Sequence, residues 1–320
     1  MSSFSRRISV LVPVYNNERT LDQLCARLAA SLAGHDYEVL LVNDGSRDGS
    51  WALLTRLAAA NPRFKAIGLS RNFGQHPAIA AALDHATGDV MILMDADLED
   101  QPEQIETLLS ALETTGYDIV YTVKDGAQES SRDLTSTFYH YVFSRIVGVP
   151  VPRRLGTFRA FTRKVLLALR AFPERHILYG PLMFYVGFRY VIVPVKRGTR
   201  PDRSSYSFGK RLRLAVNSLV TYSDLPPKLF GAVGLSMVVA PVLYGLVVVA
   251  QYVLVGRTLP QGLTVVVLLL CAIAGMLMSA IGTLGIYVFR IFQEVLARPR
   301  YLIDDTINIT TAEDHGRSRR

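Results

Sequence analysis

The feature that most constrains this fold is a pair of long stretches without a charged residue in the C-terminal part of the chain. The first runs from Phe230 to Gly256 and the second from Thr258 to Phe289. Each is longer than the roughly 20 apolar residues that a helix needs to cross a bilayer. We therefore expect two transmembrane helices, at 229–256 and 263–290. A pair of buried core helices is the alternative interpretation.

Basic residues flank these stretches on their outer sides. They are Lys210, Arg211, Arg213 and Lys228 before the first and Arg290, Arg298 and Arg300 after the second, whereas the connecting loop holds only Arg257. The positive-inside rule then places both termini in the cytoplasm, at a plasma (inner) membrane that the chain crosses more than once. Residues 207–228 mix basic and apolar side chains, which favours an amphipathic helix on the bilayer surface. Residues 291–320 form the expected cytoplasmic tail, with disorder predicted from Asp304 onward.

Residues 1–206 show the pattern of an α/β domain. Five apolar strand patterns, at 8–14, 37–42, 64–69, 90–94 and 117–121, alternate with helical patterns within about 20–60, 74–86 and 102–115. This alternation predicts a mainly parallel, doubly wound sheet with helices on both faces. Ligands of such sheets bind at the carboxyl ends of the strands. Cys25 falls in a predicted soluble helix and Cys271 in a predicted membrane helix, so no disulfide framework is expected.

Two carboxylates stand at one of these strand ends. Asp95-Ala96-Asp97 directly follows the apolar run Val90 to Met94. Hard oxygen ligands suit Mg²⁺ or Mn²⁺, which commonly accompany phosphates. Loop acids or helix caps are the alternative, because the Asp-Gln-Pro-Glu sequence that begins at Asp100 is typical of a helix start.

A second strand end is also rich in polar groups. Asn43-Asp44-Gly45-Ser46 follows the strand at 37–42, and its acid is a candidate acceptor for base N–H groups or ribose hydroxyls. Plain turn chemistry is the alternative. The sequence lacks a Gly-x-Gly-x-x-Gly after the first strand and a Gly-Lys-Ser/Thr loop, which counts against a dehydrogenase or an ATPase.

Four ordered motifs together resemble those of the inverting family 2 glycosyltransferases of GT-A fold. They are Val12-Pro13-Val14-Tyr15-Asn16-Asn17-Glu18, Val42-Asn43-Asp44-Gly45-Ser46, Arg71-Asn72-Phe73-Gly74-Gln75-His76 and Asp95-Ala96-Asp97-Leu98. The continuation into two apolar segments, ending Ala297-Arg298-Pro299-Arg300-Tyr301, is similar to the polyprenyl-phosphate glycosyltransferases among them. The resemblance implies a GT-A-type domain followed by two transmembrane helices.

The resemblance also implies roles for individual residues. Those bordering the nucleotide sugar would be Pro13, Tyr15, Glu18, Asp44, Arg71, Gln75 and Asp95. Asp97, with Asp95, would be the catalytic metal ligand, and the cofactor Mg²⁺ or Mn²⁺ would bridge the diphosphate. His76 is expected to pack or to cap a helix rather than to bind a ligand.

Two departures from the family pattern concern the acceptor. The acidic residue proposed as a base in many relatives has no counterpart near Arg153. A lipid monophosphate needs little base help, because its second pKa is about 6 and its oxygen is already anionic at cytoplasmic pH. The Gly and Lys of the family motif before the membrane are also missing. The remaining candidate groups for the acceptor phosphate are Arg200, Arg203, Ser204 and Tyr206. We count the two arginines among the predicted catalytic residues. Anchoring to anionic lipid is the alternative role for the basic residues here.

The sequence thus predicts metal-dependent, inverting transfer of a sugar from a nucleotide sugar, with UDP-glucose as first choice, to undecaprenyl or another polyprenyl phosphate for the cell envelope. A processive polysaccharide synthase is disfavoured, since its Gln-x-x-Arg-Trp motif is missing and Trp51 is the sole tryptophan. A non-catalytic membrane scaffold is the other alternative. The net charge is +8, but the basic residues concentrate beside the apolar stretches, so no nucleic-acid partner is expected. A homo-oligomer is compatible with the sequence.

Overall fold

The computed structural model describes residues 6–124, 155–172, 179–196, 198, 243, 250, 253–254, 262–296 and 298–309. Its strands are β1 (Ile8–Val14), β2 (Tyr37–Asn43), β3 (Phe64–Leu69), β4 (Val90–Leu93), β5 (Ile119–Lys124), β6 (Leu155–Thr162), β7 (Tyr190–Val195) and β8 (Ile303–Ile307). Its helices are α1 (Glu18–Ser31), α2 (Ser50–Ala60), α3 (Gln75–His85), the 3-10 turn η1 (Pro102–Gln104), α4 (Ile105–Thr115), α6 (Arg163–Arg170), α7 (Tyr179–Tyr185) and α10 (Gly262–Val295).

The described strands form one sheet in the order β7-β5-β6-β4-β1-β2-β3-β8. The central strands β4, β1, β2 and β3 run parallel to one another, as the sequence predicted. Two strands run the other way, because β6 is antiparallel to β4 and β5, and β8 is antiparallel to β3. The mainly parallel α/β architecture is confirmed, with an antiparallel strand inserted on one side and another at one edge.

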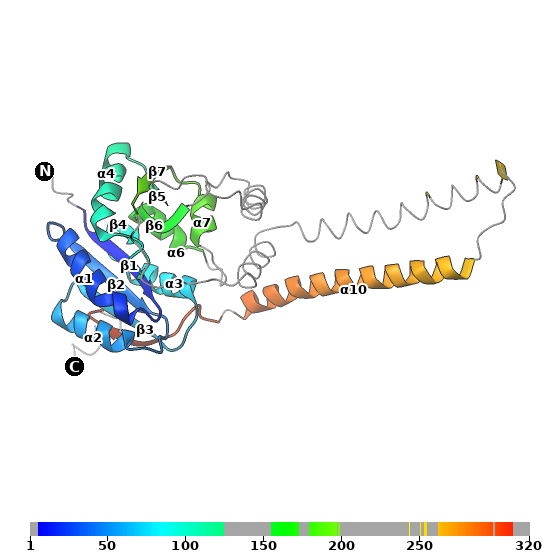
Figure 1. The fold of residues 1–320 in the computed structure, drawn as a ribbon, viewed down its shortest axis with the longest axis horizontal. Coiled ribbons are helices and arrows are strands. Elements are labelled where there is room, and N and C mark those ends of the chain that lie inside the picture. Colours follow the sequence, from blue (N-terminus) through cyan, green and yellow to red (C-terminus); the bar gives the residue numbers. More distant parts are fainter. Residues whose placement is uncertain are drawn as a thin grey trace. The chain divides into compact units, whose positions relative to one another are not determined.

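Helices cover both faces of this sheet (Figure 1). Apolar residues of α1, α2 and α4 pack on one face, and those of α3, α6 and α7 pack on the other. The central strands are buried on both faces, which explains why their sequences are continuous apolar runs rather than alternating ones.

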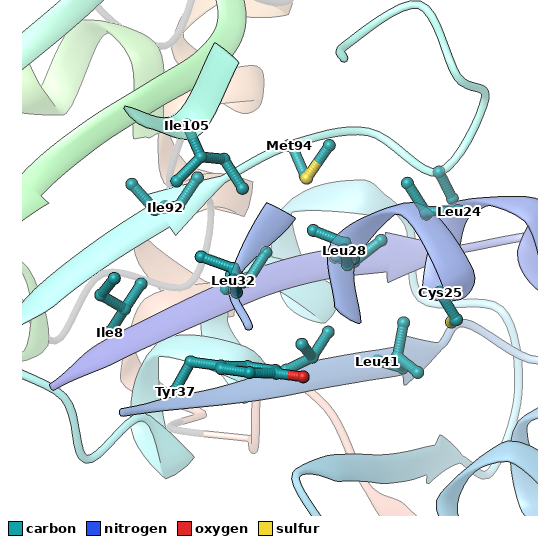
Figure 2. Close-up of a cluster of buried hydrophobic side chains, with 14 of the residues drawn as sticks. Ile8, Leu24, Cys25, Leu28, Leu32, Tyr37, Leu41, Ile92, Met94 and Ile105 are labelled. Carbon is teal, nitrogen blue, oxygen red and sulfur yellow. The ribbon is translucent and has the colours of Figure 1, made fainter. Parts of the chain in front are cut away.

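Helix α1 packs one apolar face against the sheet. Leu24 and Leu28 are spaced one turn apart on α1, and both are fully buried. Figure 2 shows them in one cluster with Leu41 of β2 and Ile92 of β4. Cys25 is buried in the same cluster, as a small apolar side chain, which agrees with its predicted place in a soluble helix.

The C-terminal tail corrects one prediction. Residues from Asp304 onward were expected to be disordered, yet β8 pairs with β3 from Ile303 to Ile307. The strand sequence Ile-Asp-Asp-Thr-Ile is too polar to predict a strand by itself. Its order depends on hydrogen bonds to the edge of β3, a non-local partner that no local pattern reveals.

The long helix α10 belongs to a second compact unit of the chain. It extends over 34 residues and contains the segment 263–290 that was predicted to be a transmembrane helix. Among the described residues, no helix combines the length and apolarity needed to cross a membrane. The predicted helix at 229–256, apart from residues 243, 250, 253 and 254, and all of 207–228 lie outside the described residues.

Candidate active site

The loops after β1 and β2 are joined into one rim at the carboxyl edge of the sheet. The Asn16 N–H donates to the Ser46 hydroxyl at 3.0 Å. Glu18 Oε2 accepts a hydrogen bond from the Gly49 N–H at 3.0 Å, and Asp48 Oδ2 accepts one from the Glu18 N–H at 3.2 Å. Glu18, predicted to border a nucleotide, therefore also fixes the neighbouring loop.

Asp44 connects this rim to the segment between β3 and α3. It is buried, and its Oδ1 and Oδ2 accept hydrogen bonds from the backbone N–H groups of Phe73 at 2.7 Å and Gly74 at 2.9 Å. Burial raises the pKa of Asp44, and those two bonds together with the Arg71 cation only partly oppose the rise. Each carboxylate oxygen has a second lone pair, so Asp44 can hold this segment and still accept from a ligand.

The approach of these two segments is very close at Gly45. Its φ of 60° lies in the left-handed region, and a Cβ there would lie 2.5 Å from the backbone carbon of Arg71 and the backbone nitrogen of Asn72. Only glycine meets both conditions. The Asn43-Asp44-Gly45-Ser46 sequence is thus more than generic turn chemistry.

Asp95 is held from three sides at the end of β4. Gln75 Nε2, at the start of α3, donates to Asp95 Oδ1 at 2.8 Å. The Asp95 N–H donates to Oδ2 of the buried Asp100 at 3.1 Å. The next carbonyl, of Ala96, accepts from the Thr20 hydroxyl of α1 at 2.7 Å. Strand β4, α1 and α3 therefore set the position of this carboxylate.

Asp97 stands in a tight turn that is half open to solvent. Its Oδ1 accepts from the Glu99 N–H at 3.0 Å, and Leu98 between them has a φ of 64°. A left-handed conformation in a leucine costs roughly 1 kcal/mol or more and tends to mark functional sites. Gly198, just beyond β7, donates its N–H to the Glu99 carbonyl at 2.9 Å and packs against the Leu98 carbonyl.

Arg159 of β6 is a buried cation to which the sequence interpretation gave no role. In the antiparallel pairing of β6 with β4 it lies opposite Leu93. Its guanidinium donates to two carbonyls of its own strand, at 2.9 and 3.0 Å, and stands 5.6 Å from the Tyr121 ring centre. Burial lowers the pKa of Arg159, while Tyr121, Asp95 and Asp100 act to raise it. A charged residue inside the pattern Phe-Arg-Ala-Phe was the signal, because a buried cation requires anionic partners.

His76 packs as predicted. Its ring centre lies 6.1 Å from that of Tyr179, its Nδ1 atom is buried, and no described residue offers that atom a hydrogen bond. Burial and the nearby Arg159 lower the pKa of His76 to about 4, so the ring is neutral at physiological pH.

The remaining predicted nucleotide contacts lie at the same edge. Pro13 is half-buried in β1, while Tyr15 is 44% exposed. Arg71 is exposed, with its guanidinium 4.1 Å from the Phe73 ring centre. The structure thus brings the four sequence motifs together, although the roles assigned to their residues stay predictions.

The predicted acceptor residues Arg200, Arg203, Ser204 and Tyr206 lie outside the described residues. The described residues that come before them in the sequence, Lys196 and Gly198, contact Gln104 and the turn that contains Asp97. Lys196, at the end of β7, exchanges backbone-to-side-chain hydrogen bonds with Gln104 at 3.1 and 3.2 Å. Gly198 packs against Leu98, so residues 196 and 198 lie beside the turn that contains Asp97.

Residues 9–170 match the family model described as "Glycosyl transferase family 2". The chain belongs to this family. It is a glycosyltransferase, and the matched region contains β1 to β6 together with the rim, Asp44 and the Asp95–Asp97 turn.

Curated relatives agree over almost the whole length. The chain is 32% identical over 93% of its length to "Uncharacterized glycosyltransferase sll0501" of Synechocystis, covering 95% of that protein. It is 33% identical to "Undecaprenyl-phosphate 4-deoxy-4-formamido-L-arabinose transferase" of Klebsiella pneumoniae, with 94% of each chain covered. Among solved structures, a mannosyltransferase of Pyrobaculum calidifontis in complex with GDP-Man and Mn²⁺ aligns with a TM-score of 0.49 and 21% identity, over 69% of this chain and 64% of that one.

The donor groups of this glycosyltransferase fit a hard divalent cation. Asp95 and Asp97 supply carboxylate oxygens from one turn, and a carboxylate has about four lone-pair sites, so it can accept a hydrogen bond and also ligate a metal. No set of three or more His, Cys, Asp or Glu side chains able to hold a metal ion occurs among the described residues. An ion bound here would complete its shell with phosphate oxygens and water, which is how Mg²⁺ and Mn²⁺ usually bind with substrate phosphates.

Proposed function

We propose that this glycosyltransferase moves a sugar from a nucleotide sugar to a polyprenyl phosphate, with inversion at the anomeric carbon, at the cytoplasmic face of a membrane. The observation that carries the proposal is the convergence of Asp44, Gln75, Asp95 and Asp97 at one edge of the sheet in a family 2 glycosyltransferase. The name of the Klebsiella relative, which acts on an undecaprenyl phosphate, supports the acceptor class.

The nucleotide would occupy the rim formed by the ends of β1, β2 and β3. Asp44 offers carboxylate lone pairs to a base or ribose, while Tyr15 and Arg71 are exposed beside it for stacking and phosphate contact. UDP-glucose is the first donor to test, with other UDP- and GDP-sugars as alternatives.

Asp97 and Asp95 would hold Mg²⁺ or Mn²⁺ against the diphosphate. When bound, the ion neutralises the charge that develops on the leaving diphosphate. Gln75 orients Asp95 through its 2.8 Å hydrogen bond, and Asp100 fixes the backbone of Asp95. Arg159 balances the negative charge of these acids from inside the domain.

The acceptor phosphate would supply its own nucleophile. A phosphate monoester with a second pKa of about 6 is mostly dianionic at neutral pH, so its oxygen attacks the anomeric carbon without a protein base. The bond to the sugar forms as the bond to the diphosphate breaks, with the two oxygens in line, and inversion results. Arg200, Arg203, Ser204 and Tyr206 are the groups proposed to bind this phosphate, in the segment after Gly198.

Membrane location is part of the proposal because a polyprenyl phosphate resides in a bilayer. The two charge-free stretches 230–256 and 258–289, with basic residues on their outer sides, support it. Both would cross the bilayer and leave the catalytic domain and both termini in the cytoplasm.

The test is sugar transfer by the purified full chain in detergent. Radiolabelled UDP- and GDP-sugars are offered one at a time with undecaprenyl phosphate, with Mg²⁺, with Mn²⁺ and with EDTA. The expected result is a glycolipid from one donor, formed only with metal. Folded protein that binds nucleotide but yields no glycolipid from any donor would contradict the proposed acceptor.

A further inference from the structure

The chain that follows α10 in sequence forms a strap along β3 and α3. We define this C-terminal strap as residues 300–308; it includes β8, which pairs antiparallel with β3. At its far end Asn308 Nδ2 donates to the carbonyls of Ala58 at 2.6 Å and Phe64 at 2.8 Å. The strap thus covers the edge of the sheet next to the proposed nucleotide rim.

Two successive strap residues hold the two elements that flank the Arg71-to-Gln75 segment. The Ser70 N–H, one residue before Arg71, donates to the Leu302 carbonyl at 3.0 Å. The Tyr301 hydroxyl donates to Asp84 Oδ2 on α3 at 2.8 Å. Because Gln75 begins the same helix, the strap constrains the segment from both sides.

A cluster of polar groups reinforces this attachment. Arg300 donates to the carbonyl of Phe172 and hydrogen bonds with Tyr179 of α7. Tyr179 is buried and also faces His76, the residue after Gln75. Burial, aided by the nearby carboxylate of Asp84, raises the pKa of Tyr301, so its hydroxyl stays protonated and donates.

We infer that the C-terminal strap is a positioning element of the donor site, which holds the Arg71-to-Gln75 segment where Gln75 meets Asp95 and where Phe73 and Gly74 meet Asp44. This inference rests on the proposed function, in which the nucleotide occupies this edge. Tyr301 acts through α3 and is a positioning residue rather than a catalytic one.

A purely structural role would give a different energetic signature. If the strap only covers the edge of β3, losing one of its hydrogen bonds lowers the melting temperature and leaves nucleotide affinity unchanged. If it positions the segment, nucleotide binding must supply the ordering that the strap no longer provides, and the Kd rises.

The experiment is a double-mutant cycle on nucleotide binding by the full chain in detergent. The Kd of UDP, and of GDP in parallel, is measured by calorimetry with MnCl₂ for the unmodified chain, Tyr301→Phe, Asp84→Ala and the double variant. We expect each single change to raise the Kd about three- to tenfold, and the double variant to match the single ones, because both remove the same bond. Asp84→Asn keeps an acceptor for the Tyr301 hydroxyl and should bind nearly as the unmodified chain does.

A matched control is Tyr185→Phe, which also removes one hydroxyl but from a side chain that is 70% exposed on α7. It should leave the Kd unchanged. An unchanged Kd in Tyr301→Phe, with the unmodified chain binding UDP or GDP, would overturn this inference alone. Failure of the unmodified chain to bind either nucleotide would overturn the proposed function, and this inference with it.

Discussion

The two ends of the same sheet hold carboxylates in opposite ways. At the amino end, Glu38 of β2 is almost fully buried and accepts hydrogen bonds from Ser9 at 2.6 Å, from the N–H and hydroxyl of Thr87 at 2.7 and 2.9 Å, and from the Lys65 ammonium at 2.6 Å. Its charge and its lone pairs are matched by donors of the protein itself. Such a group stabilises the fold.

At the carboxyl end, Asp95 and Asp97 are half-buried in the turn that follows β4. The Gln75 amide donates to Asp95 Oδ1, and the Glu99 N–H donates to Asp97 Oδ1. The comparison teaches that an almost fully buried carboxylate enclosed by donors of the protein serves stability, whereas half-buried carboxylates at the edge where the family motifs meet are placed where the proposed metal and nucleotide would bind.

The largest expected effect is on turnover, from Asp97→Asn. Losing one of the two carboxylates removes a full negative charge from the proposed metal site, and we expect kcat to fall about 10³-fold, in the range for losing one preorganised electrostatic contact. Sugar transfer at saturating donor measures this, and an unchanged melting temperature shows that the fold is intact. Full turnover in a folded variant would exclude a metal role for Asp97.

The next effect is on stability, from Glu38→Gln. The substitution leaves the half-buried Lys65 without its anionic partner, and we expect a loss of about 2–3 kcal/mol. Thermal unfolding should then show a melting temperature lower by about 5–10 °C. Turnover per folded molecule should stay close to that of the unmodified chain, and a strong loss would mean that the two ends are not separate in function.

Asp44→Asn should have an intermediate effect on both properties. An amide has one acceptor oxygen, so either Phe73 or Gly74 loses its partner, at a cost of about 1–2 kcal/mol. We expect the Kd of UDP to rise about tenfold. Asp22→Asn, in an exposed ion pair with Arg56, is the matched control and should bind UDP normally. Equal affinities in the two variants would remove Asp44 from the nucleotide site.

The smallest effect concerns pH. Burial alone would raise the pKa of Glu38, but hydrogen bonds from Lys65, Ser9 and Thr87 outweigh it and hold this pKa below its usual value. A depressed folded pKa contributes stability above the unfolded value of about 4.3, and that stability is lost as the pH falls through the folded pKa. Melting temperatures between pH 6 and pH 3 should therefore drop more steeply in the unmodified chain than in Glu38→Gln. Parallel slopes would contradict this account of Glu38.

Local sequence patterns predicted the central part of the fold well, because βαβ units form between neighbours in the chain. The apolar runs at 8–14 and 64–69 match β1 and β3 to the residue. The fifth strand was placed at 117–121 but extends over Ile119–Lys124, since its polar end is stabilised by pairing with β6 and β7. Strand β8 was missed because its pairing with β3 spans more than 230 residues of sequence.

The candidate site was predictable where each motif follows a strand, because parallel strand ends meet at one edge. The contact of Gln75 with Asp95 is the clearest case. Sequence patterns did not predict the contacts of individual side chains: Glu18 accepts from a backbone N–H of the next loop, and the buried Arg159 donates to carbonyls of its own strand while Asp95 and Asp100 favour its charge. Those outcomes depend on burial and on partners that are distant in the chain.

The most direct test of the separation between the two ends is the double variant Asp97→Asn with Glu38→Gln, assayed for sugar transfer and for thermal unfolding. Ser9 of β1 pairs with Glu38 on one side and with Met91 on the other, so Asp95, four residues beyond Met91, lies roughly 13 Å from the level of Glu38 along the strands. Asp97 lies in the turn after Asp95, so we expect the effects of the two substitutions to add. The account predicts that the double variant has the turnover of the single variant Asp97→Asn and the melting temperature of the single variant Glu38→Gln. The account is contradicted if the activation free energy calculated from kcat, or the free energy of unfolding, departs from these values by more than about 0.5 kcal/mol, because the two ends would then be coupled.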